Sequence, residues 1–236
     1  MGADQFQFKQ FTIVQDRCGM KVGTDGVLLG AWTHPNSAQR ILDIGTGTGL
    51  IALMLAQRSQ AEIDGVEIDL EACIQARENV ARSPWFHRIT VHHCRLQDYT
   101  PSGEQLYDLL VANPPFFTNV YKAAHPTRTL ARHDDHLPLI DLLKSADRLL
   151  IKEGRLTVIY PCTAVSFFNQ LAQEQGFFCN QRVWVKPTPH TPPKRVLMEL
   201  SRSSFSYPDT EITIEKNRHI YTPEFIDLIR EFYLKY

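Results

Sequence analysis

The sequence has no apolar run that approaches the roughly 20 residues needed to cross a bilayer, which argues against a membrane-spanning protein. The first residues lack a basic stretch followed by an apolar one, so we expect no secretory signal and a cytoplasmic location. Internal repeats and low-complexity segments are also missing. Hydrophobic residues make up 43% of the 236 positions and charged residues 22%, which is typical of a globular chain of about one domain.

Cysteine is scarce and charge is nearly balanced. The five cysteines are scattered and form no C-x-x-C pair, which predicts reduced thiols with neither a disulfide framework nor a metal site. The net charge is −1, so the chain is not a polycation, and binding of nucleic acid would need a local basic patch. Because no feature indicates an obligate dimer, we expect a monomer.

A glycine-rich turn is the clearest motif. Arg40–Ile44 has the pattern of a buried strand and 50–57 that of a buried helix. Three alternating glycines follow the strand: Gly45, Gly47 and Gly49. Glycines let a ligand approach the backbone, and a helix N-terminus presents free N–H groups, as in nucleotide sites. The spacing is G-x-G-x-G rather than the G-x-G-x-x-G of dinucleotide sites, which disfavours a nicotinamide oxidoreductase. Asp43, at the end of the strand, suits a ligand with a cationic amino group.

Strand and helix patterns alternate along the chain. Further strands are predicted at 61–69, 88–93, 106–112, 154–160, 176–186 and 194–201. Further helices are predicted at 27–32, 70–81, 136–150, 163–174 and 221–236. The alternation predicts an α/β fold with a doubly wound parallel sheet, in which ligands bind at the carboxyl ends of the strands.

The two ends of the chain extend this core. Alternating aromatic and polar residues at 5–14 predict a half-buried strand or hairpin. Thr24 or Asp25 is expected to cap the helix at 27–32, and Thr222 the terminal helix. We expect one domain over residues 1–236, made of an N-terminal extension (1–38), a catalytic core (39–202) and a C-terminal extension (203–236).

Polar side chains follow four of the predicted strands. They are Asp43, Glu67, Asp98 and Asn113. Parallel strands end at the same edge of a sheet, so these side chains should meet in one cleft. Glu67 could accept hydrogen bonds from both hydroxyls of a ribose, Asp98 could accept one from an adenine amine, and Leu96 could flank the ring. One carboxylate at a strand end is often only a solvated loop residue, but four polar points in register are hard to explain as packing.

The segment Asn113-Pro-Pro-Phe116 carries the sharpest chemical signal. Pro114 and Pro115 fix the backbone and remove two N–H donors, which leaves carbonyl groups free to accept hydrogen bonds. The Asn113 side-chain carbonyl and the Pro114 backbone carbonyl could together hold both hydrogens of a planar amino group. Phe116 offers a ring on which a base can stack. A stiff turn with a core phenylalanine is the alternative, which the upstream glycine turn disfavours.

In this order the motifs resemble those of the class I S-adenosylmethionine-dependent methyltransferases. The Asn-Pro-Pro-aromatic tetrad resembles that of the branch that methylates planar amino groups. The resemblance implies a Rossmann-like sheet of seven strands, the last of which form an antiparallel hairpin, and the cofactor S-adenosyl-L-methionine. It implies cofactor contacts from Thr24, Asp25, Asp43, Gly45, Gly47, Gly49, Glu67, Leu96, Asp98 and Asn113. It implies catalytic roles for Asn113, Pro114, Pro115 and Phe116.

Several segments further resemble the bacterial adenine-N(6) methyltransferases that act on valine tRNA. They are 20–32, 113–119, 131–133 and 187–195. This resemblance implies that the substrate is the anticodon-loop adenosine at tRNA position 37. Cations that could hold RNA phosphates follow the tetrad and flank a proline-rich turn. The expected RNA contacts are Lys122, Arg128, Arg132, Lys186, Lys194 and Arg195.

The implied catalysis is electrostatic and positional. The lone pair of the target amine is delocalised into the base, so the amine is the weak partner. Carbonyls from Asn113 and Pro114 would stabilise its hydrogens as the nitrogen becomes positive, with no covalent intermediate and no strong base.

Other assignments stay open. The same tetrad serves glutamine amides in release-factor methyltransferases, but those usually carry a separate N-terminal domain, and only about 40 residues precede the first motif here. DNA adenine methyltransferases commonly add a target-recognition domain, and the sequence shows no pattern for one, which disfavours this assignment. Guanine-N(2) ribosomal RNA enzymes often have a histidine where this chain has Phe117. The last alternative is an inactive subunit that binds the cofactor and RNA. The intact tetrad argues against it, because an inactive protein has no chemical need for these residues.

Overall fold

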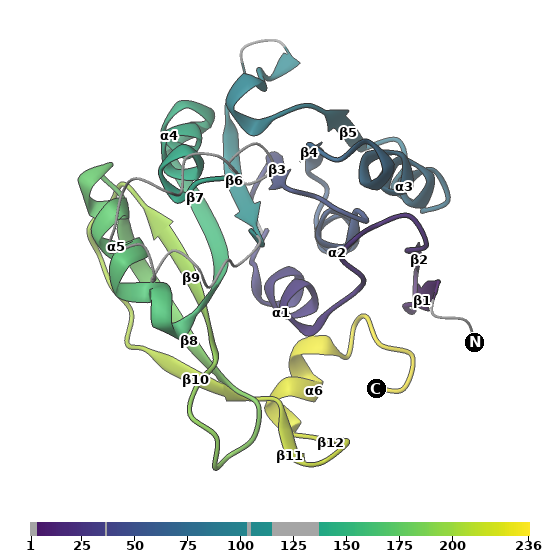
Figure 1. Ribbon diagram of the computed structural model, residues 1–236, viewed down its shortest axis with the longest axis vertical. Helices are drawn as coiled ribbons and strands as arrows, with labels where there is room; N and C mark the ends of the chain where they lie inside the picture. Colours follow the sequence, from purple (N-terminus) through teal and green to yellow (C-terminus); the bar gives the residue numbers. More distant parts are fainter. Residues whose placement is uncertain (1–3, 36, 103–104, 115–136) are drawn as a thin grey trace, which may run out of the picture.

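The computed structural model describes residues 4–35, 37–102, 105–114 and 137–236. In this part of the chain the centre is an eight-stranded sheet in the order β10-β8-β9-β7-β6-β3-β4-β5 (Figure 1). The strands are β3 (Arg40–Ile44), β4 (Glu62–Glu67), β5 (Ile89–His93), β6 (Tyr107–Ala112), β7 (Leu150–Pro161), β8 (Phe178–Lys186), β9 (Arg195–Ser201) and β10 (Thr210–Thr213). The predicted α/β class is confirmed, but the sheet has eight strands rather than seven.

Strand directions follow the expected pattern with one addition. The neighbours among β3, β4, β5, β6 and β7 pair in parallel, while β9 is antiparallel to both β7 and β8. The predicted antiparallel hairpin is therefore confirmed as β8–β9. The additional strand β10 pairs in parallel with β8 at the edge of the sheet. Its four residues are exposed or half-buried, so no apolar alternation marks it in the sequence.

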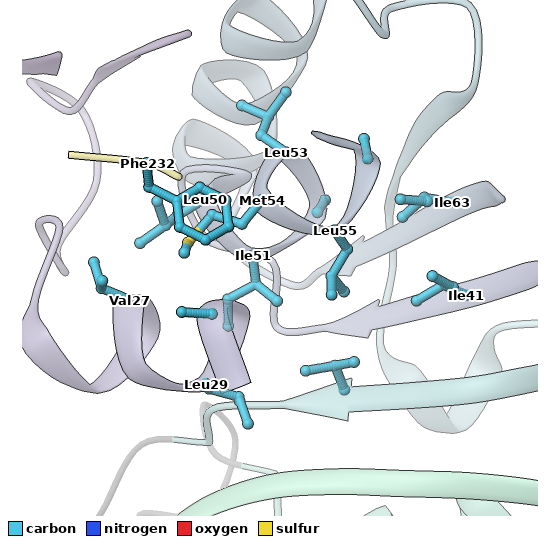
Figure 2. Packing of buried hydrophobic residues seen from close by; sticks show 14 of the residues in the cluster. Val27, Leu29, Ile41, Leu50, Ile51, Leu53, Met54, Leu55, Ile63 and Phe232 are labelled. Carbon is cyan, nitrogen blue, oxygen red and sulfur yellow. The ribbon is translucent and has the colours of Figure 1, made fainter. Parts of the chain in front are cut away.

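Helices cover both faces of the sheet (Figure 1). They are α1 (Thr24–Trp32), α2 (Leu50–Arg58), α3 (Leu70–Ala81), α4 (Leu139–Leu149), α5 (Val165–Glu174) and α6 (Pro223–Ile229), with short 3₁₀ turns η1 (Leu96–Asp98) and η4 (Cys162–Ala164). A hydrophobic core lies on each face of the sheet. Successive side chains of a strand point to opposite faces and therefore enter different cores. Ile41 packs with α1, α2 and α3, whereas Leu42 packs with α4 and α5. Figure 2 shows the first core, where Leu29, Ile51 and other side chains of α1 and α2 meet those of β3 and β4.

The N-terminal and C-terminal segments pack against each other. β1 (Gln5–Gln7) and β2 (Thr12–Val14) form the predicted hairpin, and β11 (Glu215–Asn217) pairs with β12 (Ile220–Tyr221) near the other end. Phe8 is buried and forms a β-bridge with Tyr233, with the two ring centroids 5.9 Å apart. The Lys9 N–H donates a hydrogen bond of 2.7 Å to the Phe232 carbonyl. These contacts bring residues separated by more than 220 positions into one cluster.

Two local predictions at helix ends are wrong, and one is confirmed. Helix α6 ends at Ile229 rather than at 236, because Phe232 is buried in the core and Tyr233 packs on the N-terminal hairpin. Neither Thr24 nor Asp25 caps α1, whose N-cap is Gly23, so both residues lie in the first helical turn. The N-cap of α6 is Thr222, as predicted, and its hydroxyl accepts a hydrogen bond from the Phe225 N–H.

In the described ranges no helix combines the length and apolar character that crossing a bilayer requires.

Candidate active site

The glycine-rich turn joins β3 to α2. Gly45, Gly47 and Gly49 have φ values of 68°, 56° and 82°, a left-handed conformation that side chains with a Cβ rarely adopt. The turn is held by the end of β4, because the N–H groups of Gly45 and Thr46 both donate to the Val66 carbonyl, at 2.8 and 3.1 Å. The alternating glycines are therefore needed for the backbone path itself. A Cβ built on Gly45 would meet nothing within 4 Å, so this glycine borders open space.

Asp43 is fully buried beneath this turn. Its Oδ2 accepts a hydrogen bond of 2.6 Å from the Thr46 hydroxyl and one of 3.1 Å from the Ala52 N–H. Among the described residues its Oδ1 has no hydrogen-bond partner. Burial raises the pKa of Asp43 to about 7, against the opposing effect of the two hydrogen bonds. The carboxyl group thus organises the turn with Oδ2, while its Oδ1 has no hydrogen-bond partner in the described ranges.

Glu67 connects the turn to α3. Its Oε2 accepts from the Gly47 N–H at 2.8 Å, and its Oε1 accepts from the Asp69 N–H at 3.0 Å. The Asp69 side chain in turn caps α3 by accepting from the Ala72 N–H at 2.7 Å. A carboxylate has about four acceptor positions, so two oxygens with one backbone bond each can still accept hydroxyl groups.

The strand ends meet as their register requires. Ile44 of β3 lies between Val66 of β4 and Ala112 of β6, so the glycine turn emerges beside both Glu67 and Asn113. A cleft opens at this edge. Its lining residues are Ile44, Gly45, Val66, Glu67, Ile68, Cys94, Arg95, Leu96, Gln97 and Leu137.

Two residues that line the cleft, Ile68 and Arg95, are not among the predicted site residues. Leu96 was predicted and lines the cleft, whereas Asp98 is an exposed residue of the same 3₁₀ turn. Ile68 is 46% exposed although it is apolar, and Arg95 is exposed at the rim. An apolar residue directly after Glu67 was a usable signal for Ile68. Nothing in the local sequence marks Arg95.

The 3₁₀ turn η1 is fixed by helix α4. Arg148 donates to the Tyr99 carbonyl at 2.7 Å and to the Leu96 carbonyl at 3.2 Å. Gln97 Nε2 donates to Asp141 Oδ2 at 3.0 Å. Three hydrogen bonds between this segment and helix α4, two donated by Arg148 and one accepted by Asp141, therefore hold the wall of the cleft that Leu96 contributes.

The N-terminus of α1 lies against Asn113. A Cβ built on Gly26 would be 3.1 Å from Leu50 Cδ2 and 3.9 Å from the Asn113 amide nitrogen. Asn113 is half-buried and Pro114 is buried. Because Asp25 precedes Gly26, the first turn of α1 borders the same edge as Asn113. The rest of the tetrad, Pro115 and Phe116, lies outside the described residues, as do Lys122, Arg128 and Arg132.

Two of the cations around the proline-rich turn are ion-paired. Lys186 Nζ lies 2.7 Å from Glu211 Oε2, and Arg195 Nε lies 2.8 Å from Asp25 Oδ2. Lys194 is exposed, and no described carboxylate pairs with it. The carboxylate partners come from β10 and α1, which are distant in sequence and so could not be paired by local pattern.

In the described part of the chain no group of three or more histidine, cysteine, aspartate or glutamate side chains is arranged to hold a metal ion. The cleft instead combines apolar walls with the carboxylate of Glu67, which accepts two backbone hydrogen bonds. Asp43 lies buried beside it, and its Oδ1 has no hydrogen-bond partner among the described residues.

The chain is similar to known proteins over the region that contains this site. The family model of the methyltransferase small domain matches residues 20–164, which contain the glycine turn, the cleft and the tetrad. The chain belongs to this methyltransferase family. Similarity to curated relatives extends over its whole length.

A protein of Trichodesmium erythraeum named tRNA1(Val) (adenine(37)-N6)-methyltransferase is 54% identical to this methyltransferase, and the alignment covers 100% of both chains. Proteins with the same name are 47% identical in Parabacteroides distasonis, over 100% of both chains, and 48% identical in Flavobacterium johnsoniae, over 98% and 99%.

Solved structures agree with the fold of the methyltransferase. A protein of Agrobacterium tumefaciens described as a predicted O-methyltransferase superposes with a TM-score of 0.66 at 20% identity, covering 88% of this chain and 96% of that one. The CcbJ methyltransferase of Streptomyces caelestis superposes with a TM-score of 0.59 at 15% identity, covering 80% and 96%. At these identities the similarity concerns the fold alone.

Proposed function

We propose that this methyltransferase transfers a methyl group from S-adenosylmethionine to the exocyclic N6 of an adenosine in tRNA, namely adenosine 37 of valine tRNA. The observation that carries the proposal is the junction of β3 and β6. The glycine turn and Asn113-Pro114 leave adjacent strands at the same edge. A cofactor on the turn and an amine on Asn113 would therefore be neighbours. The full-length relatives named for this reaction support the choice of substrate.

The cleft suits S-adenosylmethionine. Asp43 is buried beneath the turn, and its Oδ1 has no hydrogen-bond partner among the described residues, so its carboxyl group would favour a cationic amino group bound over the turn. The open space beside Gly45 leaves room along the backbone. Glu67 would accept from the ribose hydroxyls, while Leu96 and Ile68 offer apolar walls for a flat base. Thr24, Asp25 and Asp98 lie at exposed or half-buried positions, and we propose them as outer contacts.

Asn113 and Pro114 would supply the catalytic polarisation. S-adenosylmethionine, when bound, would supply an electrophilic methyl group. The Asn113 side-chain carbonyl and the Pro114 backbone carbonyl would accept hydrogen bonds from the two amine hydrogens, orient the nitrogen lone pair and stabilise the positive charge that develops on nitrogen. The methylated nitrogen would then lose one proton to water, and S-adenosylhomocysteine would leave. Such preorganised polar groups are effective because they need no rearrangement during the reaction. We propose that Pro115 and Phe116 complete this site by stiffening the turn and stacking on the base.

RNA would approach the same edge from the proline-rich turn. Lys194 is the described cation that is best placed to bind phosphate, because it is exposed and no described carboxylate neutralises it. Lys186 and Arg195 would contribute only as partners of Glu211 and Asp25, which weakens their attraction for phosphate. We propose that Lys122, Arg128 and Arg132 add to this surface.

The proposal extends to the location, oligomeric state and domain organisation of the chain. We propose that the chain acts in the cytoplasm as a monomer and that residues 1–236 form one domain. The packing of the N-terminal hairpin and the C-terminal Phe232 into the core shared with α2 supports the single domain.

A methyl-transfer assay tests the proposal. The protein is incubated with tritiated S-adenosylmethionine and unmodified tRNA, and the modified nucleoside is identified by mass spectrometry. We expect N6-methyladenosine in valine tRNA, and a fall in kcat of about 100-fold or more for Asn113→Ala. Asn217→Ala, which changes an exposed asparagine on β11, serves as the matched control with wild-type turnover.

Other results would redirect the assignment. Label in a protein glutamine or in DNA would keep the cofactor and replace the substrate. Tight RNA binding without transfer to any nucleic acid would favour an inactive cofactor-binding subunit. Wild-type turnover of Asn113→Ala would contradict the proposed role of the amide.

A further inference from the structure

Asn79 of α3 makes three hydrogen bonds to backbone groups from two distant segments. Its Nδ2 donates to the Val14 carbonyl at 2.9 Å and to the Thr48 carbonyl at 2.8 Å. Its Oδ1 accepts from the Val14 N–H at 2.9 Å. The side chain is 1% exposed. One buried amide thus satisfies both backbone groups of a residue on β2 and one carbonyl of the glycine turn.

The carbonyl that Asn79 holds belongs to the same glycine turn whose Gly45 lines the proposed cofactor cleft. Thr48 lies between Gly47 and Gly49, both in left-handed conformations. On the other side of Thr48, the Gly47 N–H is held by Glu67. The turn is therefore fixed from two directions, by a carboxylate on the cleft side and by an amide on the side of α3.

The same helix holds the segment that follows β2. Gln75, one turn before Asn79 and fully buried, accepts a hydrogen bond of 3.1 Å from the Arg17 N–H. The next residue, Cys18, lies near Glu67 and Asp69, which add to burial in raising its pKa. The chain then continues into α1, whose first turn borders Asn113. The N-terminal extension is thus docked on α3 and runs along the cofactor side of the molecule.

Packing alone does not account for an asparagine here. A buried amide loses hydration, and an apolar residue of similar size would fill the space without that cost. The amide is instead matched to backbone groups that would otherwise be buried without partners. This matching gives a specific position to the turn and to β2 relative to α3.

We propose that Asn79 is a positioning residue for the cofactor site, which couples the N-terminal extension to the glycine turn through the Thr48 carbonyl. The inference rests on the proposed function, because it assumes that the glycine turn binds S-adenosylmethionine. Loss of the amide would let the turn and β2 shift relative to α3. The consequence would be weaker cofactor binding, with little effect on the RNA surface around the proline-rich turn.

Asn180 offers a matched control. It is also 1% exposed, and its Nδ2 donates to two backbone carbonyls, those of Ser203 and Phe205, at 2.8 Å each. Its Oδ1 accepts from the Ser201 N–H at 3.1 Å. These partners lie at the far edge of the sheet from the glycine turn. Asn180→Asp therefore removes the same kind of hydrogen bonds without touching the proposed cofactor site.

The experiment compares Asn79→Asp and Asn180→Asp in the full chain. Binding of S-adenosylhomocysteine is measured by calorimetry, and KM is measured separately for S-adenosylmethionine and for tRNA. We expect Asn79→Asp to weaken cofactor binding about 10-fold, the effect of leaving a buried carbonyl without its donor, with the KM for tRNA changed less than about twofold. Asn180→Asp should leave the affinity for the cofactor and the KM for tRNA within about twofold of wild type.

The outcomes separate the two proposals. If wild type neither binds S-adenosylhomocysteine nor transfers methyl groups, the proposed function is wrong. If wild type binds it and Asn79→Asp binds equally well, or if both variants lose affinity to the same extent, the positioning role is wrong. Should Asn79→Asp not fold, Asn79→Ser, which is too short to reach both segments, takes its place with Asn180→Ser as control, under the same criteria.

Discussion

The buried carboxyl group of Asp43 makes the stability of this methyltransferase depend on pH in an unusual direction. Most paired carboxylates stabilise a fold when they are ionised. Asp43 is fully buried, and no cation is hydrogen-bonded to it in the described structure, so burial raises its pKa to about 7. Between about pH 4 and pH 7 the folded protein therefore binds a proton that the unfolded chain has released. The stability that this proton contributes is fully present below about pH 4 and is lost as the pH rises through 7.

The size of the effect follows from the pKa. A change from an ordinary value of 3.8 to about 7 corresponds to about 4 kcal/mol between the two protonation states. Asp43→Asn keeps an acceptor for the Thr46 hydroxyl and the Ala52 N–H but cannot ionise. The free energy of unfolding of the variant, relative to wild type, should therefore rise by about 4 kcal/mol from pH 4 to pH 8.

Urea unfolding without cofactor measures this difference. Both proteins are unfolded at several pH values from 4 to 8 and followed by circular dichroism, with Asp227→Asn as a control for an exposed carboxylate. The free energy of unfolding of Asp227→Asn relative to wild type should change with pH much less than that of Asp43→Asn. If the free energy of unfolding of Asp43→Asn relative to wild type does not change with pH, the reasoning is refuted. If it falls as the pH rises, a cation stabilises the ionised carboxylate.

Three further predictions concern the turn, the C-terminal helix and the RNA surface. Gly47→Ala should destabilise the fold by about 1–2 kcal/mol in thermal unfolding, because φ is 56°; unchanged stability would contradict this. Thr222→Ala should cost about 1 kcal/mol in the same assay through loss of the N-cap bond to Phe225, with exposed Lys216→Ala, outside the helix, as control. Lys194→Glu should weaken tRNA binding and reduce its salt dependence by about one released counterion; an unchanged salt slope would exclude phosphate contact.

Local patterns predicted much of the core. The strand at 40–44 and the helix at 70–81 have the bounds that the sequence predicts, because the period of apolar residues is a local signal. The left-handed glycines at 45, 47 and 49 are equally local, since the backbone path itself requires them. From these elements the position of Asn113 beside the turn follows by the topology of a parallel sheet.

Other features depend on contacts between distant residues, which no local pattern records. The strand β10 exists because β8 offers an unpaired edge, and its own residues carry no strand alternation. The helix α6 stops early because Tyr233 packs on Phe8, 225 positions away. The ion pair between Arg195 and Asp25 joins residues 170 positions apart.

The chemistry of the site divides in the same way. Residue types and spacing were enough to predict a carboxylate, a glycine turn and an amide at one edge of a sheet. Whether Asp43 is buried, which of its oxygens is satisfied, and which groups hold Thr48 are decided by α2, α3 and β2 as they pack. The reason is physical: burial and hydrogen-bond partners are properties of the assembled chain, and they set the pKa and the position of a side chain more than its identity does.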